Sequence, residues 1–123
     1  MASTAPLWVE PLCLIPVKYP SSGVSVRELF RRAAPDLNEP RLVEEVLTRL
    51  RLHPNLVQAW QQYSYAKRGT PSPFLDGVKV GFAEVLDEKL VIRDVHTHAS
   101  PAEACAEFVW REALWVLKHR EPA

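Results

Sequence analysis

Two histidines and an aspartate alternate along one predicted strand. Asp94, His96 and His98 stand two residues apart, and side chains at this spacing share one face of a strand. Two imidazole nitrogens and a carboxylate are ligands that zinc accepts. The sequence points to no obvious further ligand, so a polar outer face near the strand end is the main interpretation. The three residues stay as the metal candidate, and no cofactor is expected.

Cys105 is the other side chain whose type suits catalysis. It stands in the second turn of a predicted helix, a few residues after His98, where the helix dipole favours a thiolate only modestly. However, its neighbours on a helical wheel are apolar, which is typical of a core position. We therefore expect Cys105 and Cys13 to be buried free thiols in a reducing compartment.

An aromatic and basic stretch closes the third predicted helix. Trp60, Tyr63 and Tyr65 precede Lys67 and Arg68, and such interleaving can bind single-stranded nucleic acid. Lys plus Arg equals Asp plus Glu at 15 each, so the formal net charge is zero. Because nucleic-acid affinity comes mainly from phosphate neutralisation, this balance argues against nucleic acid as a partner. Trp60 and Tyr63 are assigned to the core.

No catalytic motif is visible in the sequence. It lacks a phosphate-binding loop, a nucleophile elbow and a dinucleotide fingerprint, so an enzyme is the less favoured class. The N-terminus lacks the basic and continuous apolar regions of a signal peptide. No run approaches the roughly 20 apolar residues that a membrane span needs. These observations predict a cytoplasmic protein with no membrane partner.

Length and composition predict one domain of the α+β class. A chain of 123 residues with 47% apolar and 24% charged residues resembles an ordinary globular domain. Residues 1–24 contain four prolines, which argue against a helix. We expect an extended arm over 1–24, packed on the core, followed by a single α+β domain over 25–123. The predicted order there is three short helices, a β-hairpin and a long C-terminal helix.

Local signals place these elements along the chain. Capping boxes at Ser25 and Ser100 open the first and the last helix. Residues 70–77 are expected to form a loop, because they are rich in proline and end in Asp-Gly. The hydrophobic period then changes to two, with a turn at Asp87-Glu88, which predicts a hairpin over residues 78–98.

The predicted last helix, from Ser100 to about Arg120, is apolar around most of its circumference. A surface helix needs an apolar arc of roughly 100° or somewhat more, and this arc is about twice as wide. A short chain has limited means to cover it, so we expect part of the helix to meet another chain. The residues predicted to bind a partner are Phe108, Trp110, Leu114 and Trp115. The strip predicted to face water holds Glu107, Arg111 and Lys118.

The hairpin and the start of the last helix resemble a known family. Residues Val78 to Phe108 read VKVGFAEVLDEKLVIRDVHTHASPAEACAEF, which is a strand pair, a polar turn and a helix that opens on Ser-Pro-Ala-Glu-Ala-Cys. With this pattern, residues 78–117 resemble the C-terminal part of small bacterial immunity proteins of polymorphic toxin systems. The resemblance implies a protein without catalysis that covers the active site of a secreted toxin. It assigns no binding residue.

The main hypothesis is a small cytoplasmic bacterial protein that acts by binding another protein, with an immunity or antitoxin-like role as its most concrete version. The hairpin edge is a further candidate surface. A second hypothesis is a homodimer in which the apolar helix meets its own copy. A third is an enzyme or metal-dependent protein built on Asp94, His96 and His98. A fourth is a nucleic-acid accessory protein that uses Tyr65, Lys67 and Arg68.

Overall fold

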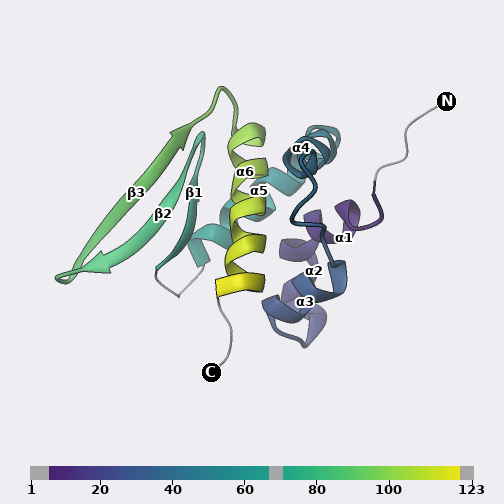
Figure 1. The fold of residues 1–123 in the computed structure, drawn as a ribbon, viewed down its shortest axis with the longest axis horizontal. Coiled ribbons are helices and arrows are strands. Elements are labelled where there is room, and N and C mark those ends of the chain that lie inside the picture. Colours follow the sequence, from purple (N-terminus) through teal and green to yellow (C-terminus); the bar gives the residue numbers. More distant parts are fainter. Residues whose placement is uncertain (1–5, 67–70, 120–123) are drawn as a thin grey trace.

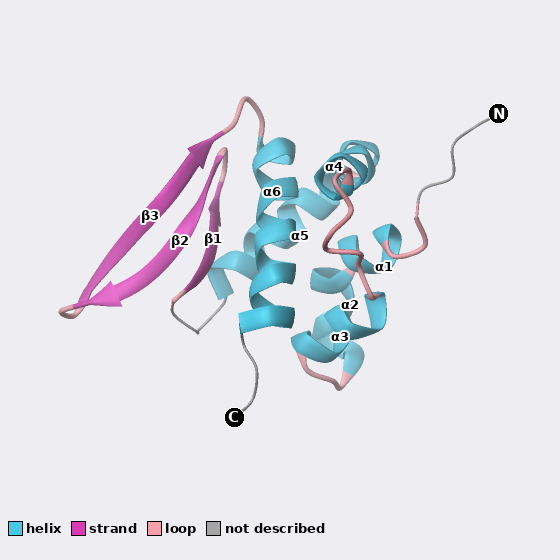
Figure 2. Ribbon diagram, in the orientation of Figure 1, coloured by secondary structure: helices cyan, strands magenta, loops and turns pink. Residues whose placement is uncertain are grey.

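The computed structural model describes residues 6–66 and 71–119 (Figure 1). The helices are α1 (Val9–Cys13), α2 (Ile15–Ser22), α3 (Val26–Ala33), α4 (Leu42–Leu52), α5 (Pro54–Ala66) and α6 (Pro101–Leu114), which the π-helical turn η1 (Trp115–His119) extends. The strands β1 (Ser72–Asp76), β2 (Lys79–Leu86) and β3 (Lys89–Thr97) form one antiparallel sheet in that order. Helices and strands are segregated along the chain (Figure 2), which confirms the α+β class and the long C-terminal helix.

Helix α6 lies at the centre of the molecule. The sheet lies on one side of it and helices α1 to α4 on the other (Figure 1), and α6 contacts α4, α5, β1 and β2. Cys105, Phe108 and Val109 are fully buried in these contacts. The wide apolar arc of this helix is therefore largely covered within the chain. The expectation that part of this helix meets another chain stays a prediction, and it concerns only the half-buried flanks of the arc.

The N-terminal arm is helical instead of extended over residues 9–22. Pro11 is the third residue of α1 and Pro16 the second residue of α2. The first backbone N–H groups of a helix have no partner within it, so proline costs little at these positions. The part of the arm that the structure describes packs on the core. The arm side chains that enter the core are Val9, Leu12, Cys13 and Ile15.

The sheet gains a strand from the predicted loop. Residues 72–76 form β1, which contains Pro73 and pairs only with β2. An edge strand tolerates a residue that cannot donate a hydrogen bond, so the prolines here mark an edge and not a loop. The predicted hairpin of β2 and β3 is confirmed, and Asp87 and Glu88 both have positive φ, at 52° and 66°, as tight hairpin turns require.

Two serine caps fix the helices that position the candidate site. The Ser25 and Ser100 hydroxyls accept hydrogen bonds from the backbone N–H groups of Glu28 and Glu103 at 3.1 and 3.3 Å, as predicted. Because Ser100 caps α6 only three residues after β3 ends at Thr97, the chain folds back sharply. The first turns of α6 therefore lie beside the end of β3.

Aromatic rings fill the core between α5 and α6. Trp60 is fully buried, its ring packs against those of Phe30, Tyr63 and Phe108, and its Nε1 donates to the Cys13 carbonyl at 3.0 Å. Trp60 and Tyr63 are core residues, as predicted, and offer no stacking surface. Tyr65 is exposed. Lys67 and Arg68, named with it for nucleic acid, lie outside the described residues.

Candidate functional site

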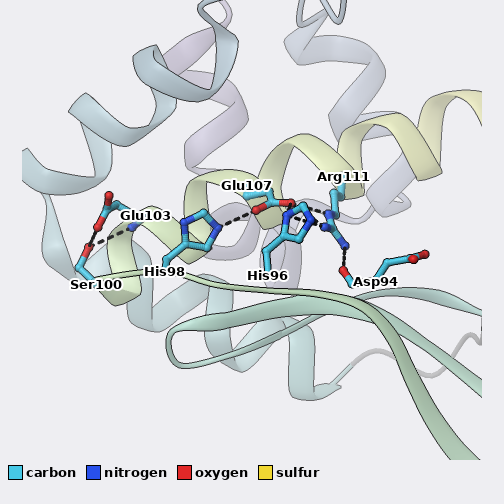
Figure 3. Close-up of polar contacts among 7 residues, drawn as sticks. All are labelled: Asp94, His96, His98, Ser100, Glu103, Glu107 and Arg111. Carbon is cyan, nitrogen blue, oxygen red and sulfur yellow. Dashed lines mark hydrogen bonds and ion pairs between the residues drawn. The ribbon is translucent and has the colours of Figure 1, made fainter.

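A polar cluster, defined by His96, His98, Glu107 and Arg111, lies between the end of β3 and α6 (Figure 3). The Glu107 carboxylate lies between the two imidazoles, with Oε1 2.6 Å from His98 Nε2 and Oε2 2.7 Å from His96 Nδ1. An ionised carboxylate only accepts hydrogen bonds, so both ring nitrogens donate in this arrangement. One glutamate thus joins α6 to His96 of β3 and to His98, one residue beyond the end of that strand.

Arg111 completes the polar cluster from the next turn of α6. Its Nε donates to Glu107 Oε2 at 2.8 Å, and its Nη1 donates to the Asp94 carbonyl at 3.1 Å. The side chains of Arg111 and Glu107 are only 14% and 12% exposed. Partly buried, charge-assisted hydrogen bonds are stronger than those between neutral groups. The arginine therefore reinforces the attachment of β3 to the helix.

The polar cluster keeps Glu107 ionised. Burial alone would raise the pKa of its carboxyl, but hydrogen bonds from His98, Arg111 and His96 and the positive charge of Arg111 outweigh burial. The pKa of Glu107 therefore lies below its ordinary value. The carboxylate can act as a fixed anion that binds the three basic side chains around it.

Glu107 and Arg111 face the sheet, which corrects the prediction that they face water. They are four residues apart and so share one face of α6. Because the chain reverses at Ser100, the end of β3 covers that face. The sequence did contain one indication of this contact. Glu107 and Arg111 are four residues apart and follow closely after the two histidines. The sequence alone did not show which helical face meets the strand.

Asp94 does not join the histidines, because a β-bulge interrupts the alternation of β3. Phe82 pairs with Arg93 and Val80 pairs with His96, so Gly81 alone faces both Asp94 and Val95. Asp94 takes a positive φ of 55°, and its carboxylate points away from the two imidazoles (Figure 3). The predicted metal candidate of Asp94, His96 and His98 is therefore not assembled. In the described parts of the chain, no group of three or more His, Cys, Asp or Glu side chains is placed to hold a metal ion.

Both cysteines are buried free thiols, as predicted. Burial raises the pKa of the Cys13 thiol to about 12, and burial likewise raises the pKa of Cys105 well above its ordinary value. A nucleophilic cysteine needs a substantial thiolate fraction near neutral pH. Neither thiol meets that requirement in the folded chain.

The opposite side of β3 is apolar and faces away from the helices. We use the term outer face for this side of the whole sheet, which also includes residues of β1 and β2. Ile92 pairs with Ala83, and Leu90 pairs with Val85. Leu90 and Val85 are 63% and 52% exposed. Antiparallel sheets that cover helices normally place apolar residues inward and polar residues outward. In β3 that order is reversed.

The apolar exposure of the molecule is concentrated on this hairpin. Strands β2 and β3 extend beyond α6, and their turn projects away from the helices (Figure 1). Within the described ranges, six of the eleven exposed large hydrophobic side chains belong to the hairpin. They are Val85, Leu86, Leu90, Val91, Ile92 and Val95. A clustered apolar surface of this kind is typical of an interaction site.

The predicted partner residues of α6 are less accessible than the hairpin. Phe108 is fully buried against Trp60 and Tyr63, so it cannot contact a partner, and this corrects its assignment. Trp110 and Leu114 are half-buried. Trp115 is also half-buried, with its ring edge-on to that of Phe82 at 5.1 Å. The role of the last three in partner binding stays a prediction.

Comparison with protein families, curated proteins and solved structures finds no match to this chain. The resemblance of residues 78–117 to immunity proteins therefore stays a prediction. Across the described residues, no helix combines the length and the apolar character needed to cross a membrane.

Proposed function

We propose that this protein acts by binding another protein through the β2–β3 hairpin, without catalysis. The observation that carries the proposal is the orientation of β3, whose polar side lies on α6 while its apolar side lies in solvent. An apolar strand face gains free energy only when another surface covers it. The hairpin is therefore built for a contact outside its own fold.

The free energy that burial of these apolar side chains would contribute supports a functional reason for this orientation. Full burial of a valine, leucine or isoleucine side chain stabilises a protein by roughly 1.5–3 kcal/mol. Leu90, Ile92 and Val95 forgo part of that gain in the isolated chain, because they are 63%, 38% and 45% exposed. Meanwhile the inward positions hold His96 and His98, which need the Glu107 carboxylate as a partner. The reversed order costs stability in the isolated chain, and a bound partner would offset that cost.

An immunity or antitoxin-like role is the most concrete version of this proposal. The stretch that resembles immunity proteins, residues 78–117, contains the hairpin and α6. A narrow projecting hairpin has the shape to enter or cover a cleft on a partner. In this version the hairpin would contact a secreted toxin, and the other helices would serve as its support.

Affinity capture with site-specific variants tests the proposal. The tagged full chain is expressed in its native host, and bound proteins are identified by mass spectrometry for wild type, Ile92→Glu and Trp110→Ala. We expect one stoichiometric protein whose capture is lost in Ile92→Glu and retained in Trp110→Ala. Equal capture by both variants would show that the hairpin is not the binding surface. Loss in Trp110→Ala alone would move the surface to α6.

A further inference from the structure

We infer that the free edge of β3 accepts an extended, acidic segment of the partner protein as an added antiparallel strand of the sheet. This inference rests on the proposed function and names the chemistry of the partner at the hairpin. It draws on the difference between the two edges of the sheet and on the charges along β3.

The edge of the sheet that β1 forms is closed by side chains of α5. Gln61 Nε2 donates to the Leu75 carbonyl at 2.6 Å, and Gln61 Oε1 accepts from the Gly77 N–H at 2.7 Å. Ser64 Oγ accepts from the Leu75 N–H at 2.9 Å. Pro73 has no N–H to offer at this edge. Another chain therefore finds no free row of backbone groups along β1.

By contrast, the edge that β3 forms is open over residues 89–93. The two-residue turn closes the hairpin with Leu86 opposite Lys89, and hydrogen-bonded pairs alternate with non-hydrogen-bonded pairs from there along the ladder. This alternation directs the backbone N–H and C=O groups of Leu90 and Ile92 away from β2. Within the described ranges, no hydrogen bond reaches these groups from another element. Every residue of β3 is exposed.

A row of free backbone groups specifies the form of its occupant. Donors and acceptors that alternate along an extended strand are matched by a second extended strand, and the resulting main-chain hydrogen bonds supply affinity. The bulge limits the length of this match, because Asp94 has a φ of 55° and its carbonyl accepts from Arg111. The regular part of the edge is therefore residues 89–93.

The side chains along this edge indicate that the added strand is acidic. Lys89, Val91 and Arg93 alternate along one side of β3, so two positive charges flank an apolar residue. Glu84 lies 3.5 Å from Arg93 and compensates one of these charges in part. A strand with acidic residues opposite Lys89 and Arg93 would form two cross-strand pairs of opposite charge, which stabilise a sheet.

A second copy of this chain is a poorer occupant of the edge. Antiparallel pairing of residues 89–93 with themselves places Lys89 of each copy opposite Arg93 of the other, and like charges directly opposite one another destabilise a sheet. Registers that avoid this contact pair a shorter part of the segment or include the bulge at Asp94. The charges of β3 therefore favour a different protein as the source of the strand.

A synthetic peptide added to the full chain tests the inference. The probe is a capped peptide of sequence Thr-Glu-Val-Thr-Val-Glu-Thr, whose valines stand opposite Leu90 and Ile92 and whose glutamates stand opposite Lys89 and Arg93. At millimolar peptide, we expect NMR shift changes at residues 89–93 and slower hydrogen exchange of the Leu90 and Ile92 amides. The same peptide with lysine in place of glutamate should bind about tenfold more weakly.

N-methylation of the peptide separates strand pairing from side-chain contact. Methyl groups on both valine nitrogens replace the N–H groups that face β3, so they should abolish binding. Methyl groups on both glutamate nitrogens point away from β3 and should leave the affinity nearly unchanged. Equal affinity of the two methylated peptides would mean that the peptide binds through side chains alone, and it overturns the inference.

Lys89→Glu is the matched test on the protein. The side chain is exposed, so the variant should stay folded, which circular dichroism checks. It should weaken binding of the glutamate peptide and strengthen binding of the lysine peptide. Unchanged affinity for both peptides overturns the acidic character of the strand. If the glutamate peptide does not bind at millimolar concentration while capture of a protein is still lost in Ile92→Glu, strand addition is overturned and the proposed function stands.

Discussion

Glu107 accepts hydrogen bonds from two elements at once. Its carboxylate binds His96 of β3, His98 just after that strand, and Arg111 of its own helix. A neutral amide in its place accepts fewer hydrogen bonds and leaves the arginine without a compensating charge. The attachment of the polar side of β3 to α6 therefore depends on this one side chain more than on any of its partners.

Replacing Glu107 by glutamine should lower the free energy of unfolding at pH 7 by roughly 2 kcal/mol, because hydrogen bonds to a charged group are lost. Denaturant unfolding followed by circular dichroism measures this change. The matched control is Glu84→Gln, which removes the 3.5 Å ion pair to the exposed Arg93 on the same side of the sheet. An exposed pair contributes about 0–1 kcal/mol. Equal losses in the two variants would contradict the special role of Glu107.

The same carboxylate predicts how stability depends on pH. The pKa of Glu107 is lowered below 4.5 in the folded chain, so its contribution is fully present above the ordinary value. That contribution is lost as pH falls through the folded-state pKa, when the carboxylate takes up a proton. Wild type should therefore lose more stability than Glu107→Gln between neutral and strongly acidic pH. Parallel stability curves for the two proteins would refute this account.

The burial of both cysteines predicts how fast they react with alkylating reagents in the folded protein. Burial raises the pKa of the Cys13 thiol to about 12 and raises that of Cys105 further, so neither thiol forms thiolate near neutral pH. We expect alkylation of the native protein to be slow and to accelerate sharply at the denaturant concentration that unfolds it. Rapid labelling of one cysteine in the native protein, read by mass spectrometry, would show that its site is open.

At the scale of elements, the bulge in β3 decides which side chains meet α6. Asp94 takes the positive φ of 55° that creates the bulge, and after it the inward positions pass to His96 and His98. In a strand of strict alternation with no bulge, Asp94 would share a face with both histidines. The bulge thus separates Asp94 from the face that His96 and His98 share.

Asp94 should be replaceable as long as the backbone conformation persists. Asp94→Gly should raise the free energy of unfolding by about 0.5–1 kcal/mol, because glycine adopts positive φ without steric cost. Asp94→Val should lower it, because a β-branched residue is strained at positive φ. Asp94→Asn should change it little, since only the carbonyl contacts Arg111. A large loss in Asp94→Asn would show that the carboxylate has a role of its own.

The elements that sequence patterns predicted are those whose signals are local. Both serine caps, the turn at Asp87-Glu88 and the period-two pattern of β2 depend on residues within a few positions of one another. Helix α1 and the start of α2 were missed because Pro11 and Pro16 were read without their positions in the first helical turn. Pro20 lies inside α2, and its position there has no such explanation. Strand β1 was missed because an edge strand tolerates the prolines that otherwise mark a loop.

The candidate site was harder to predict than the elements, for a physical reason. The sequence placed His96 and His98 on one face of a strand, but their partner Glu107 belongs to another element. Whether Glu107 meets water or the sheet depends on how α6 lies against β3, and no local pattern records that angle. The same holds for the apolar side of β3. Its sequence pattern predicts a buried side, but α6 lies against the opposite side of the strand.

At the scale of the whole molecule, stability should fall from the helical body toward the hairpin turn. The core surrounds α6, whereas residues 85–91 form a two-stranded ribbon beyond it with exposed side chains on both faces. Such a ribbon is marginally stable without further packing. At low protein concentration, we expect amides near the turn to exchange hydrogen much faster than those in the middle of α6. Hydrogen exchange followed by mass spectrometry measures both regions in one experiment.

The effect of a bound partner on that exchange connects the fold with the proposed function. Covering the outer face would add the packing that the ribbon lacks, so protection of residues 85–91 should increase when the captured protein is added, while protection of α6 changes little. In Ile92→Glu the exchange near the turn should stay fast with and without that protein. Slow exchange near the turn in the isolated chain would mean that the ribbon is stable by itself. In that case its exposed apolar side chains would need no partner to keep the ribbon folded.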